Sequence, residues 1–166
     1  MLEAEIFPFV ATAMVTPEPV LPLVSLAAFH GQTAALQAAL GVALPLTPKS
    51  VRVGETLYLW SGPDAWLVVG GAVEALTTPF AAMTDQADGR SVFTVSGPHA
   101  RDALAKLVPI DLHEQVFADG ATALTLAGHI GVQIWREGEA FRLACFRSFA
   151  QSLYASLIEA CREFED

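Results

Sequence analysis

The chain has 166 residues, enough for one domain of about 150 residues, and 53% of them are apolar, which leaves ample material for a core. Nine basic against eighteen acidic residues give a net charge of −9, the wrong sign for a protein that neutralises nucleic acid phosphates. Only 16% of the residues are charged, below the roughly 25% of an ordinary soluble domain. These values exclude nucleic acid as a partner and disorder as a state, and they favour some apolar surface that contacts another protein.

The amino terminus and the cysteines bear on location. The first five residues are acidic where a secretory signal is basic, so we expect no export. Residues 19–48 carry no formal charge, but prolines and glutamines interrupt them, which favours protein-covered surface over a membrane span. Cys145 and Cys161 lack a Cys-x-x-Cys spacing, so neither a zinc site nor a disulfide framework is indicated. The expected location is the reducing cytoplasm, away from membranes.

The chain divides into an arm and one domain. Residues 1–22 hold four prolines without steady periodicity, which predicts an extended arm that forms no regular core element and lies on the domain or on a partner. Residues 23–166 are expected to form a single α+β domain.

The first half of this domain begins with an apolar run at 23–29, which predicts a buried strand. A short helix is predicted at 33–40, with Gly41 as its stop. Two aromatic and β-branched runs, 56–60 and 66–69, flank turn residues and predict a hairpin. Residues 72–83 favour a helix that Pro79 interrupts.

The second half repeats this order. A strand is predicted at 91–96, and a helix follows from Pro98, placed at its first position, to about Val108. Strands at 122–127, 130–135 and 141–146 predict an antiparallel meander. The final helix, 148–164, begins with a capping box of Ser148 and Gln151 and carries an apolar stripe of Phe149, Leu153, Leu157 and Cys161. Strand, helix, strand, strand, helix thus occurs twice, which predicts two ferredoxin-like halves around antiparallel sheet.

Three side chains are candidates for binding a polar ligand. Asp85 and Arg90 lie in one short segment before strand 91–96, and Arg147 lies between the last strand and the last helix. The Asp111–Glu114 segment holds metal-ligand residue types but is more typical of a polar loop. The turn Ser96–Pro98, with His99 beside it, is more typical of a helix cap than of an anion site with a base. Since no nucleophile has a paired base and orienter, we assign no catalytic residue and no metal site.

Four segments together resemble the gamma subunit of heterotetrameric sarcosine oxidase. They are DQADGR at 85–90, VSGPHAR at 95–101, PIDL at 109–112 and RSFA at 147–150. Their order and spacing also match, and the likeness spans residues 23–164. The same layout is similar to a shortened folate-binding domain of the glycine-cleavage aminomethyltransferases.

The resemblance implies a noncatalytic, structural subunit of a four-subunit flavoenzyme. Such an enzyme oxidises sarcosine to glycine, produces peroxide and passes a methylene group to tetrahydrofolate. It places FAD, FMN, NAD and tetrahydrofolate on partner subunits, which are the larger flavin-containing alpha and beta subunits beside a small delta subunit. The arm and parts of residues 23–48 are then expected to contact a larger flavin subunit.

Some positions depart from the family pattern. Asp85 falls where the aminomethyltransferase relatives carry a functional carboxylate near folate, but Asp88 replaces the histidine expected three residues later. In the final helix Tyr154 replaces an expected tryptophan, which keeps an aromatic anchor.

Two other functions stay open. One is a folate-dependent one-carbon transferase in which Asp85 acts as acid or base and Arg90 or Arg147 holds the glutamyl carboxylates of folate. The other is a free-standing folate-binding regulator, a monomer that tetrahydrofolate stabilises by mass action. The aminomethyltransferase relatives carry further domains that enclose the ligand, so the subunit hypothesis ranks first.

Overall fold

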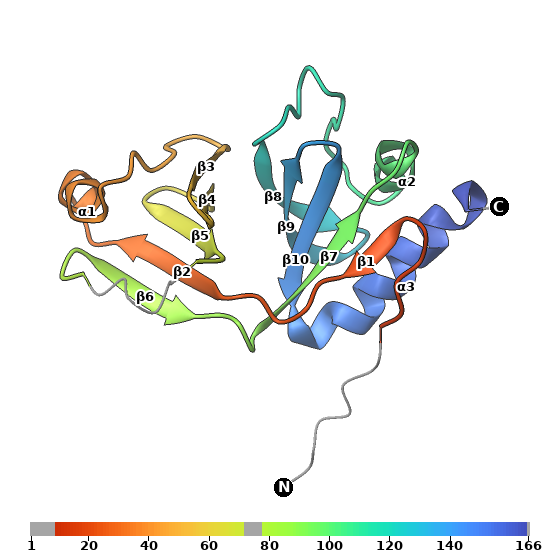
Figure 1. The fold of residues 1–166 in the computed structure, drawn as a ribbon, viewed down its shortest axis with the longest axis horizontal. Helices are drawn as coiled ribbons and strands as arrows, with labels where there is room; N and C mark the ends of the chain where they lie inside the picture. Colours follow the sequence, from red (N-terminus) through yellow and green to blue (C-terminus); the bar gives the residue numbers. More distant parts are fainter. Residues whose placement is uncertain (1–8, 72–77, 166) are drawn as a thin grey trace, which may run out of the picture.

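The computed structural model describes residues 9–71 and 78–165, which form two five-stranded antiparallel sheets (Figure 1). Sheet A has the order β1 (Val15–Pro17), β7 (Arg90–Val95), β10 (Ala140–Phe146), β9 (Ile130–Glu137), β8 (Thr122–Ala127). Sheet B has the order β3 (Ser50–Val53), β4 (Thr56–Trp60), β5 (Ala65–Val69), β2 (Leu23–Ala28), β6 (Ala81–Asp85). The predicted α+β class with antiparallel sheet is confirmed.

The two sheets share one topology. In sheet B the chain runs β2, α1 (Thr33–Leu40), β3, β4, β5, and the last of these strands pairs with the first. In sheet A it runs β7, α2 (Ala100–Ala105), β8, β9, β10, and again the last strand pairs with the first. The fifth strand of each sheet comes from outside the repeat, since β1 pairs with β7 and β6 pairs with β2. The predicted twofold repetition is therefore present, and the structure adds β1, β3 and β6 to the strands that the sequence predicts.

Three apolar clusters define the layers. The outer face of sheet A packs against α2 and α3 (Ala150–Cys161), and the outer face of sheet B packs against α1. A third cluster lies between the sheets and joins both halves; it comprises Leu23, Leu57, Leu59, Leu67, Val69, Val92, Trp135 and Ala144. Side chains alternate between the inner and outer clusters along the inner strands of each sheet, as a sheet covered on both faces requires.

Two predictions about regular structure are wrong. The expectation that residues 1–22 add no core element fails at β1, where Val15 is fully buried and pairs with Val95. The helix predicted over 72–83 fails at Ala81–Met83, which lie in β6; residues 72–77 of that prediction lie outside the described residues. In both cases the open edge of a sheet supplies backbone partners that outweigh local preference. The boundary placed at residue 22 stays a prediction.

The starts of two helices also differ from prediction. Pro98 lies in a turn closed by the Ala100 N–H donating to the Gly97 carbonyl at 3.1 Å, so α2 begins two residues later. Before α3 the chain makes a 3-10 turn, Arg147–Phe149, and the predicted Ser148 capping bond is not formed. As a result Phe149 faces solvent, whereas Leu153, Leu157 and Cys161 are buried as predicted. Within the described residues, no helix has the length and apolar character needed to span a membrane.

Candidate functional site

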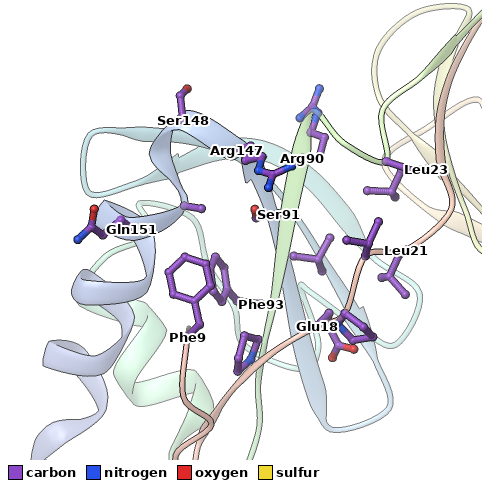
Figure 2. Close-up of a pocket in the computed structure, with 16 residues that line it drawn as sticks. Phe9, Glu18, Leu21, Leu23, Arg90, Ser91, Phe93, Arg147, Ser148 and Gln151 are labelled. Atoms are coloured by element: carbon purple, nitrogen blue, oxygen red, sulfur yellow. The ribbon is translucent and has the colours of Figure 1, made fainter. Parts of the chain in front are cut away.

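A cavity of about 320 Å³ opens where the arm, strand β7 and the start of α3 meet (Figure 2). Its apolar lining includes Phe9, Leu21, Leu23 and Phe93, and its polar lining includes Glu18, Arg90, Ser91, Arg147 and Gln151. Of the three binding residues predicted from sequence, the cavity brings together Arg90 and Arg147 and leaves out Asp85.

Aromatic contacts hold the arm over this cavity. The Phe9 ring packs edge-on against Phe93, with ring centroids 5.2 Å apart, and also contacts Tyr154 at 5.0 Å. The Tyr154 hydroxyl donates to the Val10 carbonyl at 2.6 Å. Tyr154 therefore anchors the chain's own arm, which shapes one wall of the cavity.

Arg90 begins strand β7, opposite Phe146 in the antiparallel register with β10. Its guanidinium carbon lies 4.3 Å from the centroid of the Phe146 ring, a cation–π contact. The Nε atom is shielded from solvent and has no hydrogen-bond partner among the described residues. Burial lowers the pKa of Arg90, because removing water disfavours the charged form.

Arg147 reaches the same place from the carboxyl end of strand β10, directly after Phe146. Its backbone N–H donates to the Gly89 carbonyl at 2.9 Å, and its Nη1 lies 3.4 Å from the Asp88 carbonyl. Its side chain is exposed. The antiparallel pairing of β7 with β10 is therefore what places two guanidinium groups, 57 residues apart in sequence, at one end of the cavity.

Asp85 lies outside the cavity lining and forms a hydrogen bond within its own turn. Its Oδ1 accepts a hydrogen bond from the Ala87 N–H at 2.9 Å, which closes the turn after β6. The carboxylate thus stabilises the loop that leads to Arg90.

The other polar segments also support local structure. The Asp111 carboxylate accepts from the His113 N–H at 2.8 Å, as in a polar loop. His99 lies 3.1 Å from Asp102 and stacks on Phe164 at the far end of the chain. Within residues 9–71 and 78–165, no three His, Cys, Asp or Glu side chains gather where they would hold a metal ion.

Sequence reasoning missed Glu18 and Phe9 as cavity residues. Both lie in the proline-rich arm, whose sequence has no periodicity that would place side chains on a face. The pairing of β1 with β7 and the packing of Phe9 on Phe93 and Tyr154 bring them to the cavity.

The two thiols lie in the core beneath sheet A. Cys145 is fully buried on β10, and burial raises its pKa to about 11 despite the nearby Arg90 charge. Burial likewise raises the pKa of Cys161. Thiolates are the reactive form, so neither side chain is a nucleophile at neutral pH.

We expect native protein at pH 8 to resist iodoacetamide at both cysteines. The same reagent should add two groups once urea unfolds the chain, because exposed thiols recover a pKa of about 8.5. Intact-mass measurement distinguishes the two states. Rapid labelling of the native protein would contradict the burial of Cys145 and Cys161.

Comparison with known protein families gives a match that spans nearly the whole domain. The model of the sarcosine oxidase gamma subunit family matches residues 25–163. This chain belongs to the sarcosine oxidase gamma subunit family. The match includes all three predicted binding residues and both sheets except β1 and the first residues of β2.

Named gamma subunits share about a third of their residues with this family member. Sarcosine oxidase subunit gamma of Corynebacterium sp. strain U-96 is 35% identical over 142 residues, covering 79% of this chain and 69% of the relative. The subunit gamma of an Arthrobacter species is 35% identical over 147 residues, covering 79% and 70%.

Comparison with solved structures leads to the same family. A chain of the heterotetrameric sarcosine oxidase from Corynebacterium sp. U-96, in complex with pyrrole 2-carboxylate, superimposes with a TM-score of 0.81 and 31% identity. The superposition covers 92% of this gamma-family chain and 85% of that chain. The fold described above is therefore that of a subunit found in a heterotetrameric enzyme.

Proposed function

We propose that this chain is the noncatalytic gamma subunit of a heterotetrameric sarcosine oxidase, with a structural role in assembly. The observation that carries the proposal is the superposition on a chain of the Corynebacterium enzyme over 92% of this chain. FAD, FMN, NAD and tetrahydrofolate are then held by the larger alpha and beta subunits, and a small delta subunit completes the complex. The buried, unpaired thiols Cys145 and Cys161 are compatible with a cytoplasmic complex.

The contacts of the chain's polar groups support a noncatalytic role. Three groups considered from sequence as an acid, a base or a metal ligand form contacts within the fold instead, namely Asp85, Asp111 and His99. Residues 148–158, which include most of α3, are uncharged, and this suits a helix that a partner covers in part.

Purification of the tagged chain from its own host tests the proposal. We expect yellow material with flavin absorption bands, three further subunits identified by mass, and oxidation of sarcosine by the mixture. A colourless chain that elutes alone would contradict the subunit assignment.

The Asp85→Asn variant tests the folate transferase alternative. The substitution keeps an oxygen that can accept from the Ala87 N–H, so turnover of sarcosine by the complex should stay within about twofold of the wild type. A general acid or base contributes roughly 10²–10⁴-fold to a rate. Steady-state kinetics of the purified complex with sarcosine and tetrahydrofolate measure the effect, and a hundredfold loss would support the transferase.

A further inference from the structure

Two arginines line one end of the cavity. Neither Arg90 nor Arg147 forms an ion pair with a carboxylate of the described residues. Arg90 Nε is buried without an acceptor, and Arg147 makes one long contact, 3.4 Å, to a backbone carbonyl. Buried donors without partners are rare because they lose hydration without compensation. The Nε atom itself is closed to solvent, but both side chains line the cavity and Arg147 is exposed, so their remaining N–H groups can donate to an external acceptor.

The acidic side chains near the cavity do not fill that position. Glu18, the carboxylate that lines the cavity, accepts a hydrogen bond from the Thr94 hydroxyl. Asp85 is held by the Ala87 N–H. An unpaired arginine pair stands out in a chain whose net charge is −9, and it complements a negatively charged group.

The surroundings of the arginines are apolar. Val20 on the arm lines the cavity and is 73% exposed, and Phe146, which comes directly before Arg147 in the sequence, is 51% exposed. Phe146 also stacks with Arg90. Exposed aromatic side chains beside arginines are typical of the central residues of protein interfaces. A free small carboxylate would leave this apolar rim in water.

We propose that this cavity receives a carboxylate of a partner subunit, carried by an acidic side chain or a chain terminus on an apolar segment. Arg90 and Arg147 bind the carboxylate, and the apolar rim formed by Val20 and Phe146 packs against the segment that carries it. The inference rests on the proposed subunit function, which it deepens by naming the contact surface. Arginine suits this role because its planar guanidinium donates two parallel hydrogen bonds to a carboxylate.

A competition for assembly tests the proposal. Wild-type and variant chains with different tags are produced together with the partner subunits, and mass spectrometry gives the ratio of the two chains in the purified complex. This ratio is divided by their ratio in the soluble lysate, which corrects for folding. We expect Arg147→Glu and Arg90→Gln to be incorporated about tenfold less than the wild type. Arg162→Glu, a matched control at an exposed arginine on the other end of α3, should be incorporated equally.

The outcomes separate the two proposals. Failure of the wild-type chain to recover any partner subunit would overturn the subunit function and this inference with it. Recovery of the complex with equal incorporation of all variants would overturn the inference alone. Equal incorporation together with a rise in Tm of the wild type, but not of Arg147→Glu, in sodium glutamate relative to sodium chloride would assign the cavity to a free carboxylate instead.

Discussion

Replacing Trp135 with alanine should lower the free energy of unfolding by about 3–5 kcal/mol. The side chain is fully buried on β9 and faces sheet B, in the cluster that contains Leu57, Leu59 and Leu67. Two hydrogen-bonded sheets flank the site, so the structure cannot collapse to fill the cavity left by the indole. Urea unfolding followed by circular dichroism measures the loss. Trp60→Ala, at a half-buried ring on β4, is the matched control and should cost clearly less.

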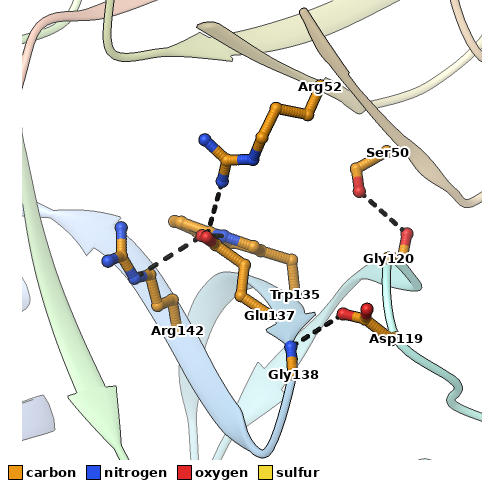
Figure 3. Close-up of polar contacts among 8 residues, drawn as sticks. All are labelled: Ser50, Arg52, Asp119, Gly120, Trp135, Glu137, Gly138 and Arg142. Carbon is orange, nitrogen blue, oxygen red and sulfur yellow. Dashed lines mark hydrogen bonds and ion pairs between the residues drawn. The ribbon is translucent and has the colours of Figure 1, made fainter. Parts of the chain in front are cut away.

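The polar contacts around Trp135 contribute less to the free energy of unfolding than its buried ring does. The indole N–H donates to Glu137 Oε1 at 2.8 Å, and Arg52 from β3 in sheet B binds Glu137 Oε2 at 2.6 Å (Figure 3). Arg142 lies 3.6 Å from the same carboxylate. Partly exposed ion pairs are worth about 0–1 kcal/mol, so Arg52→Ala should cost no more than about 1 kcal/mol. An equal loss in Arg52→Ala and Trp135→Ala would mean that ionic contacts, not the ring, hold the sheets together.

The elements that sequence predicts well are those whose own periodicity places their apolar side chains. Phe141, Leu143 and Cys145 alternate along β10 and lie together on its outer face, as predicted. Strands β1, β3 and β6 lie at sheet edges and lack such a pattern, whereas β8, also at an edge, was predicted at 122–127. Their conformation comes from pairing with β7, β4 and β2, which no local pattern records. For the same reason the helix-favouring residues Ala81 and Ala82 form a strand.

The sequence predicted which residue types bind at the candidate site, but it did not predict which of these residues lie together. Sequence identified Arg90 and Arg147 as cations at the ends of regular elements, and the cavity contains both. Asp85 was grouped with Arg90 by sequence proximity, but a strand end and a turn direct the two side chains to different partners. The register that sets Arg90 opposite Phe146 decides which residues meet, and register is a property of the folded sheet.

Gln133 joins the two halves through hydrogen bonds between the sheets. Its Nε2 donates to the Trp60 carbonyl at 3.0 Å and to Thr122 Oγ1 at 3.2 Å, and its Oε1 accepts from the Ser61 hydroxyl at 3.2 Å. The residue is 2% exposed, so water cannot replace these contacts. Period-2 alternation places Gln133 on the inner face of β9, next to Trp135 on that face, where sequence alone predicts an apolar side chain.

We expect Gln133→Leu to lower the free energy of unfolding by about 2–3 kcal/mol, although leucine is apolar and close to glutamine in size. The substitution leaves the Trp60 carbonyl and the Ser61 hydroxyl without their buried partner, and each unsatisfied group costs about 1–3 kcal/mol. Gln115→Leu at an exposed position is the control and should change stability by less than about 0.5 kcal/mol in urea unfolding. If Gln133→Leu were as stable as wild type, burial of leucine between the sheets would offset the lost hydrogen bonds. The polar contact would then serve the alignment of β4 with β9 and not the stability of the fold.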